Sequence, residues 1–350
     1  MRNQDQEHIA TPLTETNGNQ VKATSFFFFI ALLRSLATCL ITNTHYDNIW
    51  PVSSLAVGGL IGDILFFAIS GFCLINVGKK SILHWYGKRI IRIYPSVIVV
   101  TVILVFLNGT YHLGWRAWLQ QLIYPTNYPF VSSIVLLYLF FYFIGRYQKL
   151  KENIPLLMLI ITAIWLAIYY GFADKTVKLD TAEHPLTKFI FFEAMLFGGY
   201  VRLNTNQFVG RNSLWKWITT AGLLVAYFAS ILVIRKFQLL YLQPVIMVLV
   251  FLGSMAIFVA CCGIENQINR SKFIVKLTGF VAPLTLEIYI VQRYIISKVQ
   301  SLIFPLNFIV CTCLILLSAF VINRVINLCV DNVVKAIKKP TDKRDKKSDT

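Results

Sequence analysis

The chain has 350 residues, of which 57% are hydrophobic and only 14% are charged. A soluble domain of this size carries roughly 25% charged residues, so the composition excludes an ordinary soluble protein. The net charge of +17 does not indicate a nucleic-acid partner, because the basic residues gather in particular loops, as the positive-inside rule describes for membrane proteins. The composition therefore predicts an all-α, polytopic integral membrane protein in contact with membrane lipids.

Apolar runs of about 20 residues cross a bilayer as helices, and we predict about ten such spans. They cover residues 25–44, 57–77, 91–107, 130–144, 154–171, 187–201, 217–234, 245–262, 280–299 and 308–330. Basic residues cluster after the second, fourth, sixth and eighth spans, which places both termini in the cytoplasm. Residues 1–23 are then a polar cytoplasmic tail, residues 24–332 the membrane domain, and residues 333–350 a basic cytoplasmic tail.

The first span carries Arg34 in its middle and ends at His45. A charge inside a span is costly and indicates a function, and the ordinary pKa of histidine near 6.5 suits proton transfer. A step of eleven residues returns His45 to within roughly 20° of Arg34 on the helix, about 16 Å further along the axis. The pair favours a path across the membrane. The alternative for His45 is a side chain that only marks the membrane interface.

The second span carries Asp63 and Ser70, which are seven residues apart and share a helix face. An acid within a span is a candidate for function, although a structural salt bridge with Arg34 or another base is the alternative. Ser70 and Gly71 also suit close helix packing. Near the start of the third span, Arg89 and Arg92 form an i, i+3 pair beside Lys88. Two guanidinium groups at this spacing suit phosphate oxygens, and a plain positive-inside anchor is the alternative.

Together these segments resemble a known family. Residues 34–37 with His45, residues 63–72 and residues 88–95 are similar to the membrane acyltransferase family 3, which includes bacterial O-acetyltransferases of surface polysaccharides. The spacing of Arg34 and His45 matches the family's first motif, and the pair Arg89 and Arg92 matches its second.

A later segment, residues 285–292, resembles the family's motif in the ninth span. Gln292 stands where many members carry histidine. Glutamine can position a substrate through hydrogen bonds but cannot transfer a proton. Glu287 is an added ionisable group, for which catalysis and a structural ion pair are both open. For Glu193 in the sixth span we expect a structural role.

The resemblance implies an enzyme that transfers an acyl group from cytoplasmic acyl-coenzyme A to a hydroxyl of a carbohydrate or lipid-linked glycan. The expected donor is acetyl-CoA. It implies a multi-pass protein of the bacterial cytoplasmic (inner) membrane, with no metal. We assign catalysis to His45, as base or acyl carrier, with Arg34, Asp63 and Glu287. The remaining site residues are Lys88, Arg89 and Arg92 for the donor's phosphates, and Ser70, Tyr289 and Gln292 for substrate positioning.

Two other functions stay open from the residues alone. Intramembrane charges also suit a transporter or flippase of a saccharide or another anionic substrate, although no paired halves with interrupted helices are apparent. Gln292 also leaves room for a catalytically silent relative that acts as a membrane scaffold.

Overall fold

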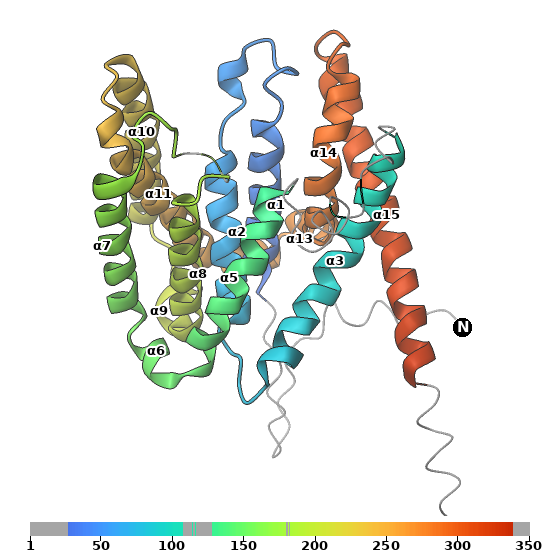
Figure 1. Ribbon diagram of the computed structural model, residues 1–350, viewed down its shortest axis with the longest axis horizontal. Helices are drawn as coiled ribbons and strands as arrows, with labels where there is room; N and C mark the ends of the chain where they lie inside the picture. The colour runs from blue at the N-terminus through green and yellow to red at the C-terminus, as the bar shows by residue number, and fades with distance from the viewer. Residues whose placement is uncertain are drawn as a thin grey trace, which may run out of the picture.

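The structure is a computed structural model that describes residues 27–107, 114, 116, 128–179, 181 and 183–338. Every regular element within these residues is a helix (Figure 1), which confirms the predicted all-α class. The predicted N-terminal tail, residues 1–23, lies outside the described residues, as do residues 339–350 of the predicted C-terminal tail. Residues 333–338 of that tail continue the last helix.

Ten long helices lie at the ten predicted spans. They are α1 (Phe28–Thr44), α2 (Gly59–Leu74), α3 (Ile82–Leu107), α5 (Pro129–Arg146), α7 (Ile154–Phe172), α8 (Thr187–Leu203), α10 (Leu214–Lys236), α11 (Gln243–Gly263), α14 (Thr285–Val299) and α15 (Leu306–Lys338). Shorter helices connect them: η1 (Ser53–Leu55), α6 (Gln148–Glu152), α9 (Thr205–Phe208), η2 (Leu240–Leu242), α12 (Glu265–Arg270), α13 (Lys272–Val281) and η3 (Ala282–Leu284).

Eight helical segments of the described chain are long and apolar enough to cross a membrane. Helix α1 is shorter, with 17 residues, and α8 also has 17 residues, which include Lys188, Glu193 and Arg202. Seventeen residues are at the lower limit for a span. The long helices run alternately in opposite directions along the bundle (Figure 1), as a polytopic membrane protein requires.

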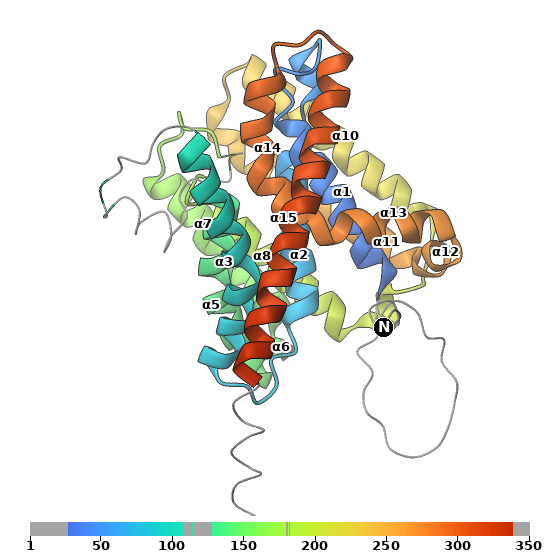
Figure 2. The ribbon, with the colours of Figure 1, turned by 90° about the vertical axis from the view of Figure 1, so that its right-hand side faces the viewer.

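The ninth predicted span is divided in the structure. Helix α13 lies across the bundle and α14 runs along it (Figure 2), with η3 between them. The break coincides with Pro283, which has no N–H to donate within a helix. The third span also differs, because α3 begins nine residues before the predicted start and carries Lys88, Arg89 and Arg92 on its first turns.

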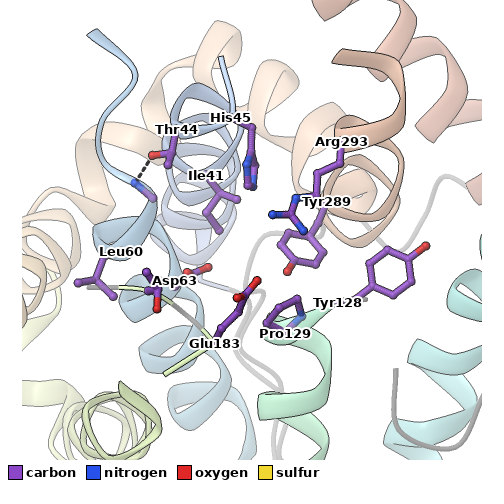
Figure 3. A pocket seen from close by; sticks show the side chains of 12 residues that line it. Ile41, Thr44, His45, Leu60, Asp63, Tyr128, Pro129, Glu183, Tyr289 and Arg293 are labelled. Carbon is purple, nitrogen blue, oxygen red and sulfur yellow. Dashed lines mark hydrogen bonds between the residues drawn. The ribbon is translucent and has the colours of Figure 1, made fainter. Parts of the chain in front are cut away.

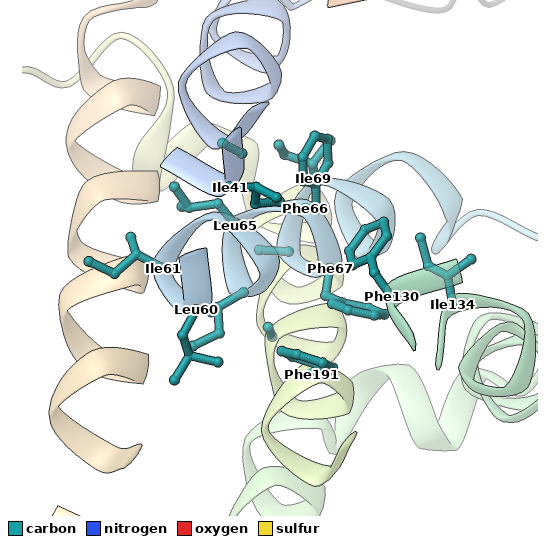
Figure 4. Close-up of a cluster of buried hydrophobic side chains, with 14 of the residues drawn as sticks. Ile41, Leu60, Ile61, Leu65, Phe66, Phe67, Ile69, Phe130, Ile134 and Phe191 are labelled. Atoms are coloured by element: carbon teal, nitrogen blue, oxygen red, sulfur yellow. The ribbon is translucent and has the colours of Figure 1, made fainter. Parts of the chain in front are cut away.

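Helix α2 is the centre of the core, and apolar side chains surround it on several sides (Figure 4). The ring of Phe67 stacks on Phe191 of α8, with the ring centroids 4.4 Å apart. The two helix backbones touch where Gly71 meets Met195 and where Gly198 meets Ala68, so a Cβ on either glycine would collide with a main-chain carbonyl. The predicted close packing at Gly71 is therefore confirmed, and it is of the small-residue type common in membranes.

A carboxylate from a distant segment holds the start of α1. Glu265, the first residue of α12, accepts hydrogen bonds from the backbone N–H groups of Phe28 (2.9 Å) and Phe29 (2.7 Å). The first N–H groups of a helix have no partner within the helix, and α1 has no side-chain cap of its own. Glu265 thus fixes the beginning of the helix that carries Arg34 and His45.

Candidate active site

His45 follows the last residue of α1, where an ordered loop holds the chain. Asn43 donates hydrogen bonds from Nδ2 to the carbonyl oxygens of Leu55 (2.8 Å) and Val57 (3.0 Å), and its Oδ1 accepts one from Trp50 Nε1 (2.9 Å). Gly58 then turns the chain into α2 with a φ of +104°, a conformation that favours glycine. These contacts fix the direction of His45 relative to α2.

The same loop is fastened to α15. The Tyr46 hydroxyl lies 3.0 Å from the Thr312 hydroxyl, and Asn307 donates a buried hydrogen bond of 3.1 Å to the Ile49 carbonyl. The ring of Trp50 packs on Phe308. These contacts join the loop after His45 to α15 and hold this end of the bundle together.

His45 faces a pocket of about 270 Å³ (Figure 3). The pocket is close to the lower limit of roughly 300 Å³ for small-ligand sites, so it has room for a single sugar ring or a group of similar size. Its walls come from α1, α2, α14, the start of α5 and the segment before α8. They comprise Ile41, Thr44, His45, Gly59, Leu60, Asp63, Tyr128, Pro129, Thr181, Glu183, Tyr289 and Arg293.

Asp63 supplies a buried acid to the pocket wall formed by α2. Its side chain is only 9% exposed, and Oδ1 has no hydrogen-bond partner within the described residues. Buried polar atoms are nearly always paired, so an unpaired oxygen at a cavity wall is available to a ligand or a water molecule. The alternative, a salt bridge of Asp63 with Arg34, is not among the contacts of the described residues, and Arg34 lies near Cys73 further along α2 (4.0 Å from Nη2 to Sγ).

Helix α14 supplies the opposite wall through Tyr289 and Arg293, which lie one turn apart (Figure 3). The Tyr289 hydroxyl accepts a hydrogen bond of 3.3 Å from the Phe130 N–H, and its ring packs on that of Phe130. The Arg293 guanidinium lies between His45 and Tyr289. Arg293 is not among the site residues predicted from the sequence, although its i, i+4 spacing from Tyr289 is a signal that could have indicated it.

His45 is a neutral imidazole at physiological pH. Burial and the nearby positive charge of Arg293 lower the pKa of His45 to about 4, with Asp47 acting in the opposite direction. The neutral form carries the free nitrogen that accepts a proton. The pocket therefore presents His45 in the form that a general base needs.

The predicted donor-binding residues lie on α3, toward the N-terminal end of α1 and away from His45. Arg89 packs its guanidinium over the ring of Trp85, 4.2 Å from the centroid, and donates a 2.7 Å hydrogen bond to the Trp85 carbonyl. Lys88 and Arg92 are exposed on the same first turns of α3. Lys88 and Arg92, together with the half-buried Arg89, form a basic surface on α3.

The Tyr138 hydroxyl donates a 3.3 Å hydrogen bond to Ser70 Oγ, and Arg34 and Arg92 both lie close enough to act electrostatically on this tyrosine. The structure thus brings Arg34 and Ser70 near Arg92 rather than into the pocket of His45. Arg34 contacts Cys73 of α2, whereas His45 lines the pocket that Asp63 of α2 also lines.

The other predicted residues lie in helix interfaces. Glu287 is buried on α14, where Oε1 accepts a 2.8 Å hydrogen bond from Ser96 of α3, and Oε2 has no partner within the described residues. Gln292 accepts a 2.8 Å hydrogen bond from Thr42 of α1 and does not line the pocket. Glu193 accepts a hydrogen bond of 2.6 Å from Thr162 of α7, a contact that joins α7 to α8.

The arrangement has a neutral imidazole, a guanidinium and the Asp63 carboxyl group, whose Oδ1 has no partner among the described residues, around one cavity. A basic surface lies toward the other end of the same bundle. The sequence model of the acyltransferase 3 family, described as an acyltransferase domain, matches residues 27–324. The chain belongs to the acyltransferase 3 family. No curated protein and no solved structure matches the chain.

Membership of this family confirms the resemblance carried by the motifs around Arg34, His45, Arg89 and Arg92. The protein is a multi-pass membrane acyltransferase, and its reaction therefore needs an acyl donor and an acceptor. Family membership therefore favours the enzyme over the transporter and scaffold alternatives.

Proposed function

We propose that this acyltransferase moves an acyl group, an acetyl group in the first instance, from cytoplasmic acyl-coenzyme A to a hydroxyl of a surface or lipid-linked saccharide. The observation that carries the proposal is the pocket, in which His45 and the Asp63 carboxyl group line one cavity and Asp63 Oδ1 has no partner within the described part of the chain. A neutral imidazole beside a cavity for a single sugar ring suits proton abstraction from an alcohol.

In this reaction His45 takes the proton of the acceptor hydroxyl as the hydroxyl oxygen attacks the thioester carbonyl carbon. A new C–O bond forms and the C–S bond breaks. The coenzyme A thiolate leaves and takes up the proton from His45, so the base is restored. Asp63 accepts a hydrogen bond from the sugar and orients it, and such positioning lowers the entropic cost of the reaction.

The basic surface on α3 supports the donor assignment. Coenzyme A carries phosphates, which suit the guanidinium groups of Arg89 and Arg92 and the ammonium group of Lys88. The stacking of Arg89 on Trp85 holds one guanidinium in a fixed position. The positive-inside pattern puts this surface in the cytoplasm, where acyl-coenzyme A is present, and His45 at the outer side.

Arg34 lies between the two ends, near Tyr138 and Ser70. Its charge is placed to guide the thioester end of the donor or to stabilise negative charge that develops there. Glu287 and Gln292 act as positioning residues in this proposal. Their hydrogen bonds join α14 to α3 and α1, and these contacts hold Tyr289 in the pocket wall.

The test uses membranes that contain matched amounts of the wild-type protein, His45→Gln or His84→Gln, supplied with radiolabelled acetyl-CoA and total cell-surface glycan. Loss of the base is expected to lower label transfer by roughly 100-fold or more. His84 is exposed on α3 and serves as the control. Normal transfer by His45→Gln contradicts the catalytic assignment, and movement of a saccharide without transfer of label contradicts the proposed reaction.

The donor site is tested with Arg89→Gln and Arg92→Gln. We expect an increased KM for acetyl-CoA and little change in the KM for the glycan. Lys149→Gln, which removes an exposed cation from α6, is the control for a general loss of positive charge. Equal effects of all three variants on the KM for acetyl-CoA would contradict the donor site and indicate that Arg89 and Arg92 only anchor the protein at the membrane.

A further inference from the structure

Arg293 has no assigned role, although its guanidinium extends into the pocket beside His45 (Figure 3). No side chain of the described residues accepts a hydrogen bond from it, and none pairs with it at ion-pair distance. An arginine held at a membrane protein's cavity without a counter-ion is available to an anion that enters the cavity.

The charges of the pocket are separated onto different walls. Asp63 of α2 and Glu183, from the segment before α8, supply carboxyl groups from one side, while Arg293 of α14 faces them from the other. A carboxyl group accepts hydrogen bonds in either protonation state, whereas a guanidinium donates and accepts none. A ligand that satisfies both walls presents hydroxyl groups to the acids and an anionic group to the arginine.

We propose that the acceptor is an acidic saccharide, whose carboxylate or phosphate group binds Arg293 while a hydroxyl of the same sugar faces His45 and Asp63. This inference rests on the proposed function, and it narrows the acceptor from saccharides in general to anionic ones. A neutral sugar leaves the guanidinium with only neutral acceptors, and a hydrogen bond to a neutral group is weaker than one to a carboxylate.

The position of Arg293 also gives the acidic group an orienting role. The guanidinium fork binds a carboxylate or a phosphate through two parallel hydrogen bonds, which fix direction as well as distance. With the anionic group held on α14 and the hydroxyls on α2, the sugar ring lies across the pocket in one direction only. Arg293 is therefore a specificity-determining residue for the acceptor.

The experiment supplies wild-type membranes with radiolabelled acetyl-CoA and total surface glycan, followed by separation of the labelled glycans by anion exchange. We expect the label in acidic glycans. Two pretreated glycan pools distinguish the anions: reduction of carboxyl groups to alcohols removes carboxylates, and phosphatase removes terminal phosphates. One of the two treatments is expected to abolish labelling. Label on neutral glycans, or labelling that survives both treatments, overturns the inference while leaving acyl transfer established.

The variant Arg293→Gln is expected to raise the KM for the acidic pool roughly 10- to 100-fold, from the loss of a charged hydrogen bond, with a smaller change in kcat. Arg293→Lys keeps the charge and is expected to retain part of the affinity. Lys298→Gln is the matched control, because Lys298 is exposed on the same helix and contacts the ring of Tyr294 outside the pocket.

Two further outcomes separate this role from others. A loss confined to kcat in Arg293→Gln indicates stabilisation of the transition state and overturns the recognition role. If Arg293 only neutralises Glu183, the double variant Arg293→Gln, Glu183→Gln regains wild-type kinetics, which also overturns it; we expect no such recovery. Absence of labelled glycan with wild-type membranes removes the proposed function itself, and this inference with it.

Discussion

Replacement of Glu265 by glutamine tests how the first helix is held in place. The carboxylate of Glu265 accepts the backbone N–H groups of Phe28 and Phe29 at 2.9 and 2.7 Å. Glutamine has nearly the same shape, but one of its two ends is an amide NH₂ that cannot accept a hydrogen bond. One N–H group at the start of α1 therefore loses its partner, and the negative charge at the positive end of the helix dipole is lost as well.

The size of the effect follows from these two losses. A hydrogen bond to a charged group contributes about 1.5–3 kcal/mol, and a charge at a helix end contributes about 0.3–1 kcal/mol. Because Glu265 is only partly buried, we expect the lower part of this range, about 2 kcal/mol. At roughly 2–4 °C per kcal/mol, Glu265→Gln is expected to unfold several degrees below the wild type.

The assay is thermal unfolding of the purified protein in detergent, followed by tryptophan fluorescence at one heating rate. Glu152→Gln is the control, because Glu152 is an exposed acid whose hydrogen bond is to Gln148 on the same short helix. We expect its unfolding temperature to stay within about 1 °C of the wild type, since exposed contacts of this kind contribute little. Equal unfolding temperatures for the two variants would refute the capping role of Glu265.

Three further predictions concern packing and catalysis. Gly198→Ala is expected to destabilise the protein by about 1–3 kcal/mol, because the added Cβ meets a main-chain carbonyl of α2. Gly222 has open space around it, so Gly222→Ala is the control in the same unfolding assay, and equal stability of the two variants contradicts the close crossing of α2 and α8. Asn43→Ala is expected to lower kcat roughly tenfold, through misplacement of His45, with no change in the KM for acetyl-CoA; steady-state kinetics check this, and an unchanged kcat contradicts it. Activity needs neutral His45, so it falls as the pH drops through the pKa near 4. Arg293→Gln removes one cause of that low pKa, so the acid limb of the pH profile of activity is expected to move to higher pH. An acid limb that stays in place contradicts the electrostatic effect of Arg293 on His45.

Much of the fold could be predicted because each helix reports its presence locally. A span is recognised from its own run of apolar residues, since the cost of burying polar groups in lipid acts on each segment separately. All ten predicted segments therefore coincide with helices. The division of the ninth segment shows the limit of this reasoning, because hydropathy alone does not register the helix break at Pro283.

The sequence also determined the residues that belong to the family. Arg34, His45, Arg89 and Arg92 were found from their spacing, and the match to the acyltransferase 3 family over residues 27–324 confirms the resemblance that they carry. Their spacing along one chain is visible without any three-dimensional information. The roles assigned to individual residues stay predictions for the experiments above.

Only the tertiary structure decided which of these residues meet. Glu265 and Phe28 are 237 positions apart, and Gln292 contacts Thr42 across 250 positions. Such contacts depend on how several helices pack at once, and no local pattern encodes them. Arg293 faces His45 for the same reason: the ordered loop after α1 fixes one side chain, the docking of α14 fixes the other, and the pocket exists only where the two helices come together.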